Sequence, residues 1–204
     1  MLAPTIQLKD TVFGLAGKPI VGPVNLTISP GDKILLEGRS GCGKTSLLRG
    51  ILGFLGKLQG TYRLDQEEMS PSAIWRLRQQ TGYISQELQL GKGRVRDWLK
   101  DCLPPTRELH ESDLSRFHLT NAILEQNLED LSRGERQRLA LVAMLAREPQ
   151  LYLLDEVTSA LNESLRNLVV SHIATTEATV LVVSHDSIWK GCEAFRTYSL
   201  PVTS

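Results

Sequence analysis

The stretch LLEGRSGCGKTSLL, residues 35–48, decides the fold. A short apolar strand leads into it and a helix with apolar spacing follows it, so the glycine-rich turn Gly38–Thr45 joins a strand to a helix. The turn fits the pattern G-x-x-x-x-G-K-[ST], whose backbone N–H groups converge on phosphate oxygens. Lys44 would add a positive charge, and Thr45 would add a hydroxyl ligand for Mg²⁺. A turn that only caps a structural helix is the alternative, and the flanking strand and helix disfavour it.

Further strands end in residues that suit phosphate chemistry. The stretch LYLLDE is a buried strand that ends in Asp155, placed to hold Mg²⁺, and Glu156, placed to polarise a water that attacks a γ-phosphate. Taken alone, this acidic pair fits equally well a strand end that caps the next helix. His185 follows the buried strand TVLVVS, and Gln86 follows the strand-like TGYIS. Because the carboxyl ends of parallel strands share one edge of a sheet, where ligands bind, we expect these residues near Lys44.

The stretch LEDLSRGERQRLALVAMLA, residues 128–146, predicts the start of a buried helix. Ser132 and Glu135 are spaced as a capping box, in which each side chain accepts a hydrogen bond from the other residue's backbone N–H. The apolar run that follows has no polar face, as in a helix inside a large core. The free N–H groups and the dipole at such a helix start favour an anion.

Composition indicates a soluble globular chain of 204 residues, enough for one domain or for a core with one inserted subdomain. Lys and Arg together number 23, as do Asp and Glu, so the formal charge is zero and no nucleic-acid partner is expected. Cys42, Cys102 and Cys192 fit no disulfide or zinc pattern, which favours a reducing cytosol. The N-terminus lacks the features of a signal peptide, and no apolar run reaches the ~18 residues that span a bilayer.

The order of these patterns predicts an α/β fold with an insertion. Residues 5–28 read as short strands broken by glycine and proline. Residues 87–130 change character, with helix-like pieces such as VRDWLKDCL and a pair of prolines. We therefore expect a P-loop NTPase core over 1–86 and 135–204, with N-terminal antiparallel strands, a mixed or parallel sheet and flanking helices. A small helical subdomain, 87–134, is expected to be inserted into it and to carry the turn at Ser132.

Five stretches in order along the chain resemble the motifs of ATP-binding cassette (ABC) ATPases: GRSGCGKT, YISQ, LSRGERQRLALVAMLAREP, LYLLDEVTSALN and VVSHD. The resemblance covers nearly the whole chain. It implies a RecA-like core that binds ATP and Mg²⁺, and a head-to-tail homodimer in the ATP-bound state. Each ATP would lie between the phosphate loop of one subunit and the signature turn of the other. The anion at the helix start near Ser132 would then be the γ-phosphate of an ATP held by the partner subunit.

The resemblance also implies a role for each motif residue. The catalytic set would be Glu156 as general base, His185 as the switch histidine, Lys44 and Gln86. The metal ligands would be Thr45, Gln86 and Asp155. The nucleotide would be bound by Gly38, Arg39, Ser40, Gly41, Cys42, Gly43, Lys44, Thr45 and Ser46 of one subunit and by Ser132, Gly134 and Glu135 of the other. Residues 159–162 resemble the D-loop, which contacts the opposite subunit.

Several positions depart from the family pattern. Arg133 stands where glycine is usual, so the geometry of the signature turn or the affinity for ATP is expected to change. Asn162 replaces the usual aspartate of the D-loop and removes a charge. Phe13 is the local candidate for the aromatic residue that stacks on adenine, with Leu15 the alternative at the aligned position. Val157 replaces a proline, and together with RFHL and the short insertion it resembles the bacterial iron-export cassettes.

The leading hypothesis is the ATPase subunit of an ABC transporter, which couples ATP hydrolysis to the movement of a substrate by a separate integral-membrane permease. The subunit would be cytoplasmic and peripheral on the inner membrane. It would receive a permease helix in a groove near Leu88, Leu90, Val95 and Trp98. The chief alternative, a soluble ABC-type ATPase that acts on DNA or the ribosome, is disfavoured by the single cassette and by the lack of coiled-coil heptads. A regulatory module without catalysis is opposed by the intact catalytic residues.

Overall fold

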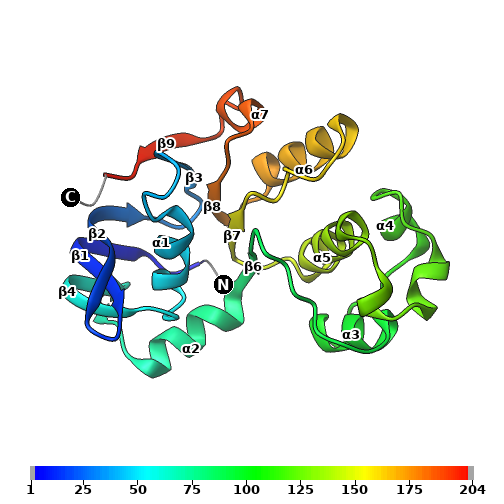
Figure 1. Cartoon of the computed structure of the whole chain (residues 1–204), viewed down its shortest axis with the longest axis horizontal. Helices are drawn as coiled ribbons and strands as arrows, with labels where there is room; N and C mark the ends of the chain where they lie inside the picture. The colour runs from blue at the N-terminus through cyan, green and yellow to red at the C-terminus, as the bar shows by residue number, and fades with distance from the viewer. Residues whose placement is uncertain (1–2, 202–204) are drawn as a thin grey trace.

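The computed structural model describes residues 3–201, which form two β-sheets flanked by helices (Figure 1). The first sheet is antiparallel in the order β2-β1-β4-β5, over Lys18–Ile28, Ile6–Leu15, Gly56–Leu64 and Glu67–Glu68. The second sheet is parallel in the order β6-β7-β8-β3-β9, over Thr81–Ile84, Leu151–Asp155, Thr179–Val183, Lys33–Glu37 and Arg196–Ser199. The predicted fold, antiparallel N-terminal strands beside a parallel sheet, is confirmed.

The parallel sheet separates two hydrophobic cores because successive side chains of a strand point to opposite faces. In β7, Leu151 and Leu153 belong to one core, and Tyr152 and Leu154 belong to the other. The same alternation holds in β3 and β8. Both faces of these strands are buried, which explains why each is a continuous apolar run in the sequence.

The first core lies between the two sheets. Helix α1 (Lys44–Ile51) fills it with three fully buried side chains, Leu47, Leu48 and Ile51. Helix α2 (Pro71–Gln80), at the bottom of Figure 1, joins the same core. The sequence analysis did not predict α2, although its start carries a clear signal: Ser70 accepts a hydrogen bond from the Ala73 N–H, and proline occupies the first helical position.

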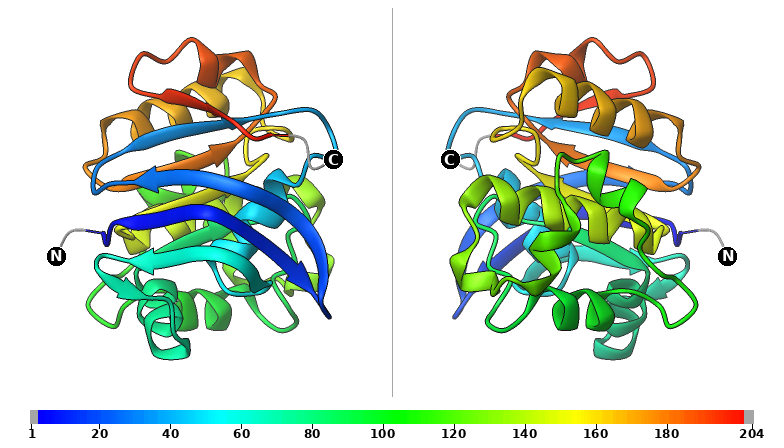
Figure 2. Two further views of the ribbon diagram at one scale, coloured as in Figure 1. Left: turned by 90° about the vertical axis from the view of Figure 1, so that its left-hand side faces the viewer. Right: turned by 90° about the vertical axis from the view of Figure 1, so that its right-hand side faces the viewer.

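The second core lies on the other face of the parallel sheet, under α5 (Arg133–Arg147) and α6 (Glu163–Thr175). The segment between β6 and β7 adds α3 (Val95–Cys102), α4 (Glu111–Ser115) and two 3₁₀ turns, Asn121–Glu125 and Leu128–Asp130. Figure 2 shows the strand-rich side of the molecule in one view and the helix-covered side in the other. We refer to α3, α4 and α5 with the turns between them as the helical lobe. Its apolar residues share one core with β7.

A short neck joins the two ends of the part of the helical lobe that precedes α5. The Val95 N–H donates to the Gln126 carbonyl at 3.0 Å, and the Leu128 N–H donates to the Gly93 carbonyl at 2.8 Å. These antiparallel contacts bring the two ends of the intervening segment together.

After β8 the chain forms the short helix α7 (Ser187–Lys190) and then β9, which pairs with β3 at the edge of the parallel sheet. The sequence analysis predicted neither element. None of the helices within residues 3–201 is both long and apolar enough to cross a bilayer.

Candidate active site

The glycine-rich turn connects β3 to α1, as the sequence predicts. Gly43 precedes the helix with a φ of +98°, a left-handed conformation, and a Cβ there would lie 2.9 Å from the Val21 side chain. At Gly38 a Cβ would lie 2.6 Å from the Cys42 sulfur. Cys42 is buried in the first core, so its side chain supports the loop from inside. The turn therefore depends on glycine at these two positions.

Lys44 lies over this loop with its charged end held in place. The residue is 8% exposed, and its Nζ donates to the carbonyls of Gly38 at 2.8 Å and Arg39 at 3.1 Å. Its position at the start of α1 adds a positive charge where the free N–H groups and the helix dipole already favour an anion. The loop therefore suits the binding of a phosphate group.

Asp155 ends strand β7 with its carboxylate inside the protein. The residue is 1% exposed, and within the described part of the chain neither carboxylate oxygen has a hydrogen-bond partner. Burial raises the pKa of this carboxyl, while the nearby Thr45 hydroxyl, Arg49, the backbone N–H of Gln86 and Lys44 act in the opposite direction. A buried carboxylate without partners is costly, and Mg²⁺ prefers oxygen ligands. Thr45 and Gln86 line the same pocket, so the oxygen donors present there fit a Mg²⁺ ion.

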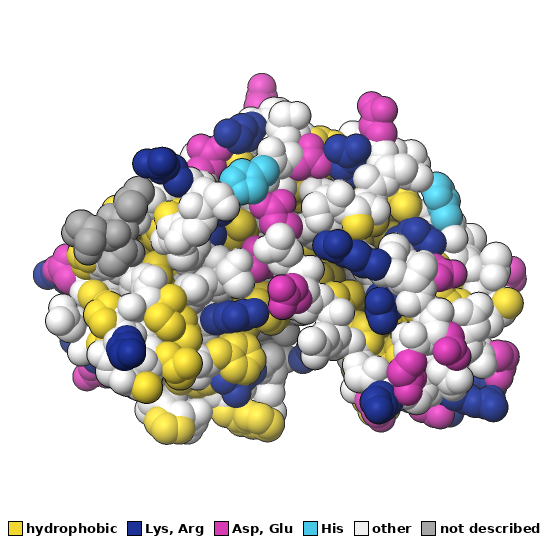
Figure 3. Space-filling model, viewed as in Figure 1, with side chains coloured by type: hydrophobic (Ala, Val, Ile, Leu, Met, Phe, Trp, Pro, Cys, Tyr) yellow, Lys and Arg dark blue, Asp and Glu magenta, His cyan; other side chains and the backbone are white. Residues whose placement is uncertain are grey.

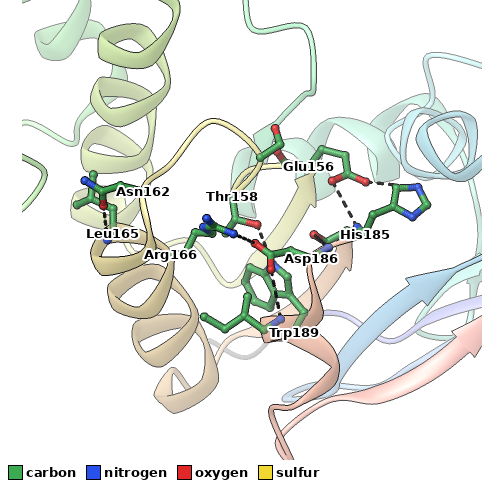
Figure 4. A network of polar contacts seen from close by, with 11 residues as sticks. Glu156, Thr158, Asn162, Leu165, Arg166, His185, Asp186 and Trp189 are labelled. Carbon is green, nitrogen blue, oxygen red and sulfur yellow. Dashed lines mark hydrogen bonds and ion pairs between the residues drawn. The ribbon is translucent and has the colours of Figure 1, made fainter.

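Glu156 follows with a left-handed backbone, φ +53°, which is costly for a residue that carries a Cβ. Its N–H donates to the Val183 carbonyl at 2.9 Å, and its carbonyl accepts a bond from the Ser159 hydroxyl at 2.8 Å. The carboxylate lies beside His185 (Figure 4). The distance between His185 Nε2 and Glu156 Oε1 is 3.8 Å, and the backbone N–H of His185 donates to Glu156 Oε2 at 3.4 Å. The strained backbone therefore places a carboxylate and an imidazole together.

A polar network supports the chain on both sides of this pair (Figure 4). The indole N–H of the buried Trp189 donates to Thr158 Oγ1 at 3.2 Å. Arg166 Nη1 lies 3.3 Å from Oδ2 of Asp186, the residue after His185. The first contact ties the loop after β7 to the segment after β8, and the second ties α6 to the same segment.

Asn162 has a structural role at the start of α6. Its side-chain oxygen accepts a hydrogen bond from the Leu165 N–H at 3.0 Å, which caps the helix (Figure 4). Asparagine and aspartate are about equally good at this position of a helix. The departure from the family's aspartate therefore keeps the helix start intact while it removes a charge.

A pocket of about 460 Å³ opens at the carboxyl edge of the parallel sheet. Its lining residues are Ser40, Gly41, Gly43, Lys44, Thr45, Ser46, Gln86, Asp155, Glu156, Ser159, Val183 and His185. The adjacent strands β6, β7, β8 and β3 deliver these residues side by side, as expected for an open α/β sheet. Sequence reasoning placed Ser159 at an interface and missed Val183, which is simply the last residue of β8. Gly38, Arg39 and Cys42 belong to the loop but do not line the pocket.

The prediction that Phe13 stacks on adenine is wrong. Its side chain is 1% exposed and lies in the first core, where its ring meets Tyr62 edge-on with the centroids 5.6 Å apart. On the other side, a Cβ on Gly50 of α1 would lie 2.5 Å from the ring. No face of Phe13 is therefore left for a base. Leu15, the alternative, is 61% exposed at the end of β1.

The capping box predicted at Ser132 is present at the start of α5. The Glu135 N–H donates to Ser132 Oγ at 3.2 Å, and Glu135 Oε2 accepts bonds from the Ser132 hydroxyl and N–H at 2.6 and 2.9 Å. The bond from the Ser132 hydroxyl lowers the pKa of Glu135 most, and the bond from the Ser132 backbone N–H lowers it further. Arg133 is exposed at the first helical position. None of the described residues that line the phosphate pocket comes from this turn, so Ser132, Gly134 and Glu135 lie outside the pocket of their own chain.

A second hollow, of about 770 Å³, lies between the helical lobe and the rest of the molecule, at the lower centre of Figure 3. Apolar lining residues from the loop after β6, from α3 and from α5 include Leu88, Leu90, Trp98, Ala140, Ala143 and Met144. Polar and charged residues, Gln79, Gln89, Asp101 and Arg147, line the hollow as well. We call it the apolar groove. Leu88, Leu90 and Trp98, which the sequence analysis placed near a groove, are partly buried and line it. For Val95 the prediction is wrong, since its side chain is fully buried in the helical lobe.

The parallel sheet with its phosphate loop and strand-end carboxylates defines a P-loop nucleoside triphosphatase. The family model described as "ABC transporter" matches residues 21–159, more than half of the chain. The chain therefore belongs to the ABC transporter family and is an ATP-binding ATPase.

Individual relatives agree with this assignment. The chain is 31% identical to "Probable iron export ATP-binding protein FetA" of Escherichia coli K12, over 90% of its own length and 86% of the relative's. It is 32% identical to "Energy-coupling factor transporter ATP-binding protein EcfA1" of Lactiplantibacillus plantarum, over 80% of the chain and 62% of that relative. The solved structure of a bacterial Atm1-family ABC exporter with ATP bound matches 98% of the chain with a TM-score of 0.83. At 19% identity, and with 38% of the exporter chain covered, this match shows the shared fold.

Proposed function

We propose that this chain is the ATPase subunit that powers an ABC transporter whose permease is a separate membrane protein. The observation that carries the proposal is the presence, on one chain, of a phosphate pocket with its strand-end carboxylates and of an exposed apolar groove. The pocket supplies the hydrolytic chemistry. An apolar hollow of this size on a surface is typical of a site that binds another protein or a ligand.

ATP binds with its phosphates against the loop, where Lys44 and the N–H groups at the start of α1 neutralise their charge. Mg²⁺ would be held by Thr45, Gln86 and Asp155, and it would supply further charge neutralisation at the phosphates. Glu156 orients and polarises the attacking water. His185, 3.8 Å from its carboxylate, keeps that carboxylate facing the pocket.

A head-to-tail homodimer in the ATP-bound state completes the nucleotide site. Ser132, Gly134 and Glu135 lie outside the pocket of their own chain, so a second copy is needed to bring such a turn to the γ-phosphate. The capped start of α5 suits this task, because its free N–H groups and dipole favour an anion. The exposed Arg133 adds a positive charge to the same surface.

The apolar groove receives a short helix of the permease. Groove residues such as Leu90 and Trp98 are partly exposed and suit the apolar face of an amphipathic helix. In this arrangement the chain is cytoplasmic and bound to the inner face of the membrane through the permease. The likeness to FetA, together with Val157 and the short insertion, favours iron or a related metal ion as the exported substrate.

The alternative is a soluble ABC-type ATPase that acts on DNA or the ribosome. Zero formal charge disfavours it, because nucleic-acid binding relies on clustered Lys and Arg. The gene beside this one separates the two functions: a multi-span membrane protein encoded there supports transport, and a DNA-repair or translation factor supports the alternative.

Glu156→Gln tests the hydrolytic mechanism. The substitution keeps the size of the side chain and removes its charge, so we expect kcat to fall by roughly 10²–10⁴-fold, as when a positioned base is lost. ATP binding should survive because no phosphate contact is removed. Lys44→Ala is the matched variant, since it removes such a contact and should weaken binding itself. Hydrolysis at the wild-type rate by Glu156→Gln would exclude Glu156 as the base.

A further inference from the structure

We propose that Gln137 is a positioning residue that holds Glu156 and links it, through α5, to the apolar groove. The inference rests on the proposed function of Glu156 in hydrolysis. It assigns a role to a residue of the helical lobe that does not line the nucleotide pocket.

Gln137 is a polar side chain on a buried stretch of α5. It is 7% exposed, and its Nε2 donates to the carbonyl of Val157 at 2.5 Å. Val157 is fully buried and directly follows Glu156. A buried amide is costly unless it is hydrogen-bonded, and from Leu139 to Ala143 the same helix is buried and apolar. The glutamine therefore has a specific partner, and that partner is the carbonyl of the residue that follows the proposed base.

Glu156 needs such support because its backbone is left-handed, a conformation that persists only when its surroundings hold it. On the N-terminal side, its N–H is bonded to Val183 of the central sheet. The bonds from Ser159 are local to the loop itself. Among the hydrogen bonds of the described residues, the one from Gln137 alone joins the loop 156–159 to the helical lobe.

The same face of α5 continues into the groove. Gln137, Ala140 and Met144 follow the spacing i, i+3, i+7, so they lie along one side of the helix. Ala140 and Met144 line the groove, while Gln137 reaches the loop after β7. A helix moves as a rigid body, so an occupant that shifts α5 at the groove also shifts the carbonyl contact next to Glu156.

Gln137→Met tests the role, because methionine keeps the length and volume of the side chain and removes the donor. Displacing a catalytic group by about 1 Å can cost 10²-fold in rate, so we expect kcat to fall by about 10- to 100-fold. KM and the dissociation constant for ATP should stay within about twofold, since no nucleotide contact changes.

Thr81→Val is the matched control. It also removes a buried side-chain bond to a carbonyl, from Thr81 Oγ1 to Leu77 at 2.7 Å, but it does so at the end of α2. Both variants should lose a similar few degrees of Tm, and only Gln137→Met should lose kcat. Should Gln137→Met fail to fold, Gln137→Asn, which keeps the amide but is too short to reach Val157, is measured in its place.

The double variant Gln137→Met with Glu156→Gln decides whether the glutamine acts through the glutamate. If it does, the residual rate of Glu156→Gln should not fall further, because residues that act as a unit are not additive. Wild-type kcat in Gln137→Met, or a full further loss in the double variant, would overturn the inference. A wild-type rate in Glu156→Gln alone would instead overturn the proposed function.

Discussion

Asp155 and Glu156 show, at the scale of single residues, how the site departs from what stability alone would favour. One carboxylate is buried without a hydrogen-bond partner among the described residues, and the next residue has a left-handed backbone. Both features cost free energy in the folded chain. Both lie at the end of β7, on the pocket that suits a metal ion and phosphates. The free-energy cost of both features therefore falls at the site where the binding of a metal ion and phosphates can offset it.

Asp155→Asn should separate the cost from the function. In metal-free buffer we expect the variant to be more stable than the wild type, because a buried charge is replaced by a neutral group of the same shape. A gain of about 1 kcal/mol corresponds to a rise in Tm of about 2–4 °C for a domain of this size. Mg²⁺-dependent ATP hydrolysis should be lost. A lower Tm in metal-free buffer would contradict the account of Asp155.

Phe13→Leu tests the reassignment of the aromatic residue from adenine to the core. We expect a loss of about 1–2 kcal/mol of unfolding free energy in urea denaturation, because the ring loses its edge-on contact with Tyr62 and leaves a small void. KM for ATP should stay within about twofold. A large rise in KM at unchanged stability would restore Phe13 to the nucleotide site.

At the scale of elements, the sequence predicts best where one pattern fills a whole strand or helix. The short apolar strand before the glycine-rich turn and the strand at LYLLDE are present as β3 and β7, because buried parallel strands are unbroken apolar runs. Phe13 was assigned to adenine through the family resemblance, which does not tell on which face of β1 the residue lies; β1 contains register shifts between Leu8 and Gly14. These bulges break the alternation of faces, so spacing along β1 no longer tells which side chains are buried. Strand β9 was missed because it is short and largely exposed.

The capping box of α5 gives a prediction at this scale. Ser132→Ala should cost about 1 kcal/mol, or about 2–4 °C in Tm, as for other helix caps. The pKa of Glu135 is lowered in the folded chain, so its bonds with Ser132 stabilise the fold above the ordinary pKa of 4.5 and are lost as pH falls through the folded value. The gap in Tm between the variant and the wild type should therefore narrow in acid.

Ser70→Ala is the control for that experiment. Ser70 caps α2 in the same way, but the first turn of α2 has no acidic residue. The difference in Tm between Ser70→Ala and the wild type should therefore stay constant over the same range of pH. If the difference in Tm between Ser132→Ala and the wild type were also independent of pH, this result would contradict the role given to Glu135.

At the scale of the whole molecule, the sequence predicted that the strand-end residues lie together, because the carboxyl ends of parallel strands share one edge of a sheet. These residues do line one pocket. The groove was foreseen through the family resemblance. The link from Gln137 to Val157 was beyond sequence reasoning, because a glutamine in a buried helix has no local signal for a partner twenty residues away.

The proposed dimer gives the prediction for the whole molecule. With Mg-ATP, Glu156→Gln should double its mass in multi-angle light scattering, because bound and unhydrolysed nucleotide bridges two subunits. Without nucleotide it should remain a monomer. Adding Lys44→Ala to the same chain should abolish the dimer, since the phosphate contact is lost. Equal dimerisation with and without ATP would refute a nucleotide-bridged interface.

The neck at the base of the helical lobe has a consequence for how such chains change over evolution. Because the backbone bonds between Val95 and Gln126 and between Leu128 and Gly93 already fix the two ends, residues added or removed beyond them form part of a closed loop. Doubling the length of a closed loop costs only about 0.6 kcal/mol of chain entropy. The segment beyond the neck can therefore gain or lose turns while the sheet, the pocket and α5 keep their geometry. Insertions and deletions among descendants of this chain should accumulate between residues 96 and 125.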